Sequence, residues 1–158
     1  MRHEGDMEKA IGFLATGFGA GRLPGPKGTY GTLVAIPLSL IFSQLPTIPY
    51  LLTIITMVFV AVWVSEQMVR ITGNHDPQIV VIDEIVGYMI AMALIPHNIG
   101  FMVLAFVLFR ICDIVKFWPI RWFEKNLTGG WGVVMDDVAA GVVVQLLLRG
   151  LIWYVTTV

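Results

Sequence analysis

The sequence contains few charged residues and only one cysteine. Of its 158 residues, 13% are Asp, Glu, Lys or Arg, whereas an ordinary soluble domain has about 25%. The single cysteine, Cys112, excludes an internal disulfide and a cysteine-based metal site, and we interpret it as a small apolar helix residue. The net charge of -1 and the absence of a basic cluster give no indication of a nucleic-acid partner.

Hydrophobic residues are correspondingly abundant. They make up 57% of the chain, and the mean hydropathy is +0.81. This composition is typical of an integral membrane protein. We therefore predict an all-α fold in a single domain covering residues 1–158. It would be a membrane bundle of about four to five apolar helices with a polar face on the cytoplasmic side. A soluble bundle of buried helices is the alternative.

Polar turns divide the chain into apolar segments. A polar N-terminal segment, 1–10, could form a short interfacial helix, and the glycine-rich stretch 17–31 is predicted to be a loop. The segments that we predict as helices are 32–45 (with Pro37 inside), 50–64, 79–95, 99–112 and 132–158. Several are shorter than the roughly 20 residues of a straight membrane span, so local thinning of the bilayer is expected.

Charged residues gather on one side of this arrangement. If the segments alternate in direction, the turns at 46–49 and 96–98 lie on one side of the membrane. The polar stretches 1–31, 65–83 and 110–137 lie on the other side. Every charged residue except Arg149 then falls in, or within one residue of, the second side. Nine of the ten basic residues lie there, so the positive-inside rule predicts that it is cytoplasmic. We expect a multi-pass membrane protein.

Five carboxylates lie next to or inside the apolar segments. They are Asp83, Glu84, Asp113, Asp136 and Asp137. Carboxylates in such positions are normally paired, hydrated or bound to metal. Each one alone could be an acid that stabilises a helix N-terminus. As a set they favour one shared site for a hard cation, Mg²⁺ in particular.

Small residues follow two of these acids at helical spacing. Asp83 precedes Gly87 and Ala91, and Asp137 precedes Gly141 in the same way. Stripes of small residues let two helices approach closely, so this pattern predicts that the two carboxylates meet.

Cationic residues and a glycine-rich loop accompany the acids on the same side. Arg110, Lys116, Lys27 and Thr29 are candidates for binding phosphate, although Arg110 and Lys116 could instead form structural ion pairs. His75 is interpreted as a solvated loop residue rather than an acid or base. Carboxylates for a metal, cations and exposed backbone N–H groups together suit phosphoryl transfer.

Four strings carry a family resemblance, in the same order as in the family. They are PGPKGTYGTLVAIP (24–37), IDEIVGYMI (82–90), FRICDIVKFWPIRWFE (109–124) and GGWGVVMDDVAAG (129–141). With them the chain resembles the bacterial phosphatidylglycerophosphatase A family. Phe117 stands where the family commonly has proline, and Thr32 where it commonly has serine. Both departures spare the charged residues.

The resemblance implies a Mg²⁺-dependent membrane phosphatase that hydrolyses phosphatidylglycerophosphate to phosphatidylglycerol and phosphate. It implies that the five carboxylates supply catalytic and metal-binding positions. Either a water molecule or an aspartate would attack phosphorus, and the sequence does not choose between them. It also leaves open the number of metal ions and the oligomeric state.

Three other functions each predict a different sequence pattern. A small ion or metal transporter would carry its acids at mid-membrane rather than at segment ends. A CDP-alcohol phosphotransferase, another membrane lipid phosphotransferase, would show spaced aspartates with a DG opening and an AR pair, which are missing here. A purely structural subunit would leave the segregated charges unexplained.

Overall fold

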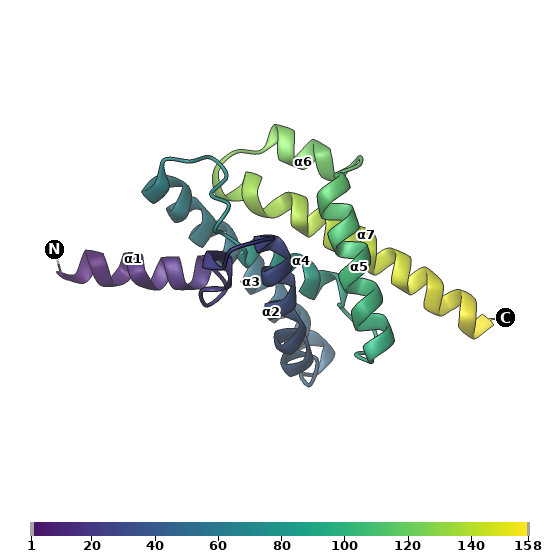
Figure 1. Cartoon of the computed structure of the whole chain (residues 1–158). Helices are drawn as coiled ribbons and strands as arrows, with labels where there is room; N and C mark the ends of the chain where they lie inside the picture. The colour runs from purple at the N-terminus through teal and green to yellow at the C-terminus, as the bar shows by residue number, and fades with distance from the viewer. Residues whose placement is uncertain (1, 158) are drawn as a thin grey trace.

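All the regular structure in residues 2–157, the part that the computed structural model describes, is helical, and side chains are described for residues 5–157. Its elements are α1 (Arg2–Ala15), the 3-10 turn η1 (Ala20–Arg22), α2 (Lys27–Phe42), α3 (Thr47–Thr72), α4 (Ile82–Ala91), α5 (Ile99–Val115), α6 (Ile120–Asn126) and α7 (Gly129–Thr157). Helix α1 and the C-terminal end of α7 project from opposite sides of the bundle (Figure 1). The expectation of an all-α fold is confirmed.

The short helix α4 lies at the centre of the bundle. It packs against α2, α3, α5 and α7 (Figure 1), and eight of its ten residues are buried. Tyr88 and Met89 are fully buried within the main apolar core. Contacts with four neighbouring helices hold α4 in place. They thereby also hold its first turn, which carries Asp83 and Glu84.

Two helices of the described chain are long and apolar enough to cross a membrane, judged by length and composition. They are α3, with 26 residues, and α7, with 29. Helix α2 is also apolar but is shorter, with 16 residues. The expectation of four to five spanning helices therefore stays a prediction for the other helices.

The predicted loop at 17–31 is wrong in its last part. Helix α2 begins at Lys27, directly after Pro26, whose backbone is extended (φ -75°, ψ 90°). The hydroxyl of Thr32 donates to the carbonyl of Gly28 at 2.8 Å within the helix. The glycines of this stretch therefore do not prevent helix formation once Pro26 has set its start.

Helix α3 is also longer than predicted at both ends. Pro49, predicted in a turn, lies in the first turn of α3, where its missing N–H leaves no hydrogen bond unmade. The helix continues through residues 65–72, where Ser65 and Met68 are buried and Val69 packs against the apolar core. It ends at Gly73, whose positive φ of 66° favours glycine.

The bounds of the other helices also differ from the predicted ones. Helix α4 covers only 82–91 of the predicted segment 79–95, and α5 continues to Val115. The predicted connection 113–131 contains the short helix α6. The N-terminal helix α1 covers Arg2–Ala15 and thus extends beyond the polar segment 1–10.

Candidate functional site

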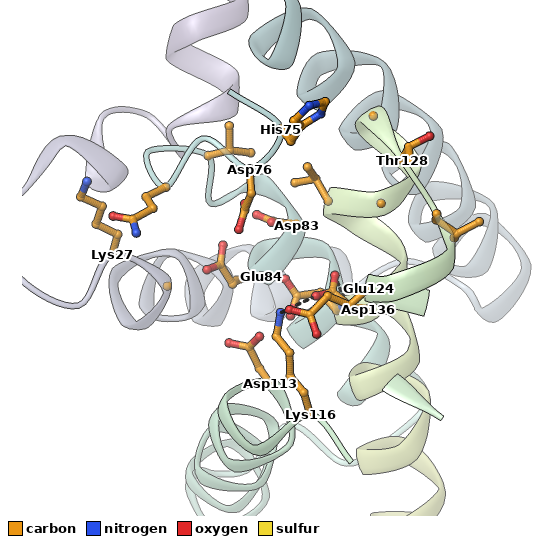
Figure 2. A pocket seen from close by; sticks show the side chains of 18 of the residues that line it. Lys27, His75, Asp76, Asp83, Glu84, Asp113, Lys116, Glu124, Thr128 and Asp136 are labelled. Atoms are coloured by element: carbon orange, nitrogen blue, oxygen red, sulfur yellow. Dashed lines mark hydrogen bonds and ion pairs between the residues drawn. The ribbon is translucent and has the colours of Figure 1, made fainter. Parts of the chain in front are cut away.

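A cavity of about 480 Å³ opens where the first turns of α2, α4 and α7 meet the end of α5. Its wall is completed by α6 and by the loop between α3 and α4. Charged and histidine side chains dominate the lining: Lys27, His75, Asp76, Asp83, Glu84, Asp113, Lys116, Glu124, Asp136 and Asp137. All five carboxylates singled out from the sequence therefore line one cavity. Figure 2 labels four of them, Asp83, Glu84, Asp113 and Asp136.

Three of these carboxylates form a tight cluster. Asp83, Glu84 and Asp137 each have an oxygen within 4.8 Å of the other two. Asp83 Oδ1, Glu84 Oε2 and Asp137 Oδ1 are buried and have no hydrogen-bond partner among residues 5–157. Asp83 and Asp137 are only 8% and 4% exposed. Buried negative charges this close repel one another, so the cluster requires a cation or protons to neutralise it.

The other two carboxylates already have cationic partners. Asp113 Oδ2 lies 2.8 Å from Arg110 Nη1. Lys116 Nζ donates to Asp136 Oδ2 at 2.8 Å and to Glu124 Oε1 at 2.9 Å. Of the five predicted carboxylates, Asp83, Glu84 and Asp137 are therefore the three that form no ion pair within the described part of the chain.

Lys116 keeps its positive charge at this site. Burial alone would lower the pKa of Lys116, but the hydrogen bonds and charges of Asp136 and Glu124 outweigh burial and raise it. The backbone of Lys116 ends α5 in a left-handed conformation (φ 46°). Because its pKa is raised, Lys116 remains a cation beside the carboxylates at neutral pH and is not available as a base.

Glycines on α4 and α7 bring Asp83, in the first turn of α4, close to Asp137, which lies eight residues after the start of α7. A Cβ on Gly87 would lie 2.8 Å from the carbonyl oxygen of Asp137, and a Cβ on Gly141 would collide with the carbonyl oxygen of Gly87. The backbones of the two helices are thus in direct contact. Asp83 and Asp137 each precede one of these glycines by one turn, so the predicted meeting of the two small-residue stripes is confirmed.

Helix α2 approaches the cluster through another glycine. A Cβ on Gly28 would collide with Glu84 Oε1 and would lie 2.7 Å from Arg110 Nη1. No side chain caps this end of α2. Lys27 lines the cavity, but Figure 2 shows its ammonium at the edge of the view, directed away from the carboxylates.

Two of the four proposed phosphate-binding side chains lie outside the cavity lining. Thr29 is not among the residues that line the cavity, and neither is Arg110, which pairs with Asp113. Gly28, which was not singled out from the sequence, takes the place next to the cluster.

Sequence reasoning also missed two acids of the cavity. Asp76, in the loop before α4, directs its carboxylate into the cavity, whereas His75 lies farther out (Figure 2). Asp76 belongs to the stretch where the charges segregate, so that signal was available. Glu124 is eight residues after Lys116, across a helix end, and no helical spacing links the two.

Comparison with known proteins identifies the family. The family model described as Phosphatidylglycerophosphatase A matches residues 13–152. The chain is 41% identical over 131 residues to phosphatidylglycerophosphatase A of Escherichia coli (strain K12), covering 82% of this chain and 76% of that protein. It is 35% identical over 134 residues to phosphatidylglycerophosphatase A of Haemophilus influenzae (strain ATCC 51907 / DSM 11121 / KW20 / Rd), covering 84% and 82%.

A third relative carries a different name. The protein called "Putative phosphatidylinositol-3-phosphatase" of Bacteroides thetaiotaomicron, strain VPI-5482, is 38% identical over 150 residues, covering 90% of this chain and 93% of that protein. No solved structure matches the chain. All three relatives are named as phosphatases of phosphorylated lipids. The chain belongs to the phosphatidylglycerophosphatase A family and is a phosphatase.

Proposed function

We propose that this chain is a Mg²⁺-dependent phosphatase that converts phosphatidylglycerophosphate to phosphatidylglycerol and inorganic phosphate, a step of phospholipid biosynthesis. Two relatives with this name, at 41% and 35% identity, support the substrate. The observation that carries the chemistry is the cluster of Asp83, Glu84 and Asp137, whose buried oxygens have no partner and border a cavity.

The cluster fits a divalent cation. Its donors are hard carboxylate oxygens within 4.8 Å of one another, and Mg²⁺ binds to one or two carboxylates together with water and phosphate oxygens. Asp83, Glu84 and Asp137 would hold the ion, whereas Asp113 and Asp136 would act through their ion pairs. A bound Mg²⁺ supplies neutralisation of the phosphate charge and activation of the attacking oxygen.

The remaining groups of the cavity bind the phosphate and orient it. The Lys116 ammonium, held by Asp136 and Glu124, can donate to a phosphate oxygen entering the cavity. The uncapped first turn of α2 adds backbone N–H groups beside Glu84. In the hydrolysis the bond between phosphorus and the glycerol oxygen breaks, and that oxygen takes up a proton. The attacking oxygen comes directly from water, or from an aspartate of the cavity whose bond to phosphorus is then hydrolysed by water to release phosphate.

We propose a bacterial inner membrane location with the cavity at the cytoplasmic interface. Support comes from the two helices long enough to span, α3 and α7, and from the bias of basic residues toward the cavity end. The acyl chains of the substrate would stay in the bilayer while the head group enters the cavity. Asp83 and Glu84 lie in the first turn of α4, and Asp113 lies near the end of α5 beside Arg110. This placement favours the enzyme over an ion pathway, whose acids lie at mid-membrane.

A second substrate is favoured by the third relative. Its name refers to a phosphatidylinositol 3-phosphatase, and it matches 90% of this chain. Phosphatidylglycerophosphate and phosphatidylinositol 3-phosphate both carry a phosphate monoester on the head group of an anionic lipid. The cavity chemistry serves either one, so the head group that fits best must be found by assay.

The test is phosphate release by the purified full chain in lipid nanodiscs that contain one of these two lipids, with and without Mg²⁺. We expect Mg²⁺-dependent release from phosphatidylglycerophosphate, faster than from phosphatidylinositol 3-phosphate. An Asp83→Asn variant should lose about 100-fold or more, because a metal-binding carboxylate is removed. Faster release from the inositol lipid would overturn the assigned substrate. Equal release by wild type and variant would remove Asp83 from the site.

A further inference from the structure

A carboxylate of α3 holds the first turn of α7. The backbone N–H of Gly130 donates to Glu66 Oε2 at 2.8 Å. The other oxygen, Glu66 Oε1, accepts from Arg70 Nε at 3.0 Å. The first N–H groups of a helix have no partner within the helix, and its N-terminus attracts negative charge. Glu66 therefore caps α7 from a neighbouring helix.

Glycines make this contact possible. A Cβ on Gly129, whose φ is +62°, would collide with Glu66 Oε2. A Cβ on Gly130 would collide with the carbonyl oxygen of Val62 and would lie 2.8 Å from the backbone nitrogen of Glu66. The start of α7 thus rests directly on the backbone of α3, so its position depends on this contact.

The cap lies close to the cavity along α7. Asp136 and Asp137 follow Gly130 by six and seven residues, or about 9–10 Å along the helix at roughly 1.5 Å per residue. Glu66 itself does not line the cavity. Any effect of Glu66 on the reaction must therefore pass through the position of α7.

We propose that Glu66 is a positioning residue that, by capping Gly130, sets the depth and rotation at which α7 presents Asp137 to Asp83 and Glu84. This inference rests on the proposed function for its kinetic part only. The hydrogen bond to Gly130 carries the effect, and Arg70, which is exposed (68% of its side chain), only supports Glu66.

Three variants of the full chain separate these contributions. Glu66→Met keeps the length of the side chain but has no oxygen to accept from Gly130. Glu66→Gln keeps an acceptor and removes the charge. Arg70→Gln removes the ion pair and leaves the cap in place. Each is measured for kcat and KM of phosphate release from phosphatidylglycerophosphate, and for amide hydrogen exchange over residues 130–137.

Glu66→Met should lower kcat by about 10- to 100-fold, because small misplacements of catalytic groups have effects of this size. KM for the lipid should change less than kcat, because the first turn of α2 does not lie on α7 and Lys116 keeps its bond to Glu124 of α6 when its other partner, Asp136 of α7, shifts. Amide exchange should rise at 130–134. Glu66→Gln should restore most of kcat and of the protection, and Arg70→Gln should resemble wild type.

Equal loss of kcat in Glu66→Gln and Glu66→Met would overturn the proposal, and so would unchanged exchange at 130–134 in Glu66→Met. A loss in Arg70→Gln as large as in Glu66→Met would overturn it as well. If the wild type releases no phosphate from this lipid, the proposed function fails, and hydrogen exchange alone decides whether Glu66 holds α7.

Discussion

The carboxylates of the cavity differ in what neutralises them. Asp113 and Asp136 pair with Arg110 and Lys116, whereas buried oxygens of Asp83, Glu84 and Asp137 have no partner. Breaking a buried ion pair leaves one charge uncompensated. Removing the partner of Asp113 or Asp136 would therefore destabilise the fold even without a ligand. The negative charges of Asp83, Glu84 and Asp137, in contrast, repel one another until a cation or protons neutralise them.

Replacement of Lys116 tests this difference. Lys116→Gln removes the cation that holds Asp136, a residue only 7% exposed, and we expect a loss of stability of about 1–3 kcal/mol together with slower phosphate release. Thermal unfolding of the purified protein measures the first effect. Lys125→Gln is the control because Lys125 is exposed and lies outside the cavity lining. Equal unfolding temperatures for the two variants would contradict the role of Lys116.

At the scale of helices, the contact between α4 and α7 builds the cluster. Gly87 and Gly141 let the two backbones touch, and the amide of Gln145 donates to the carbonyl oxygen of Ala93 at 3.3 Å farther along the pair. The acids at the start of this contact are close because the helices cannot separate there without losing packing.

Alanine at Gly141 should push α7 away from α4. Its Cβ would collide with the carbonyl oxygen of Gly87, which is backbone and cannot turn aside. We expect a loss of stability of about 1–3 kcal/mol, typical of overpacking, and reduced phosphate release. Gly150→Ala on the same helix is the matched control, because nothing lies within 4 Å of its added Cβ. A Gly141→Ala protein as stable and active as Gly150→Ala would contradict the contact.

The helix contact could be predicted from the sequence, but the helix boundaries and the ion pairs could not. Spacing alone places Gly87 and Gly141 one turn after acids. The pairing of Lys116 with Glu124 depends on the left-handed end of α5 and on where α6 lies, and no local pattern specifies either. The continuation of α3 past Val64 depends on tertiary burial of Ser65 and Met68, which overrides the polar composition there.

For the whole molecule, the helix lengths can be compared with the thickness of a bilayer. Helix α4 has 10 residues, about 15 Å at roughly 1.5 Å per residue, which is half of the roughly 30 Å hydrocarbon core. Helix α7, with 29 residues, is about 43 Å long by the same measure. In the proposed membrane arrangement, α3 and α7 cross the bilayer. Helix α4 extends only part of the way through it, with Asp83 and Glu84 in its first turn at the cytoplasmic interface.

The most direct test of the central claim is divalent-cation binding by the cluster. Mn²⁺, which prefers the same oxygen ligands as Mg²⁺, can be titrated into the purified full chain and followed by electron paramagnetic resonance. The proposed site predicts that the wild type binds Mn²⁺ in competition with Mg²⁺. It also predicts that Asp137→Asn weakens binding by about 10-fold or more, since a charged ligand is lost, whereas the exposed Asp6→Asn on α1 does not. Undiminished binding in a folded Asp137→Asn protein would contradict the claim that Asp83, Glu84 and Asp137 hold the metal.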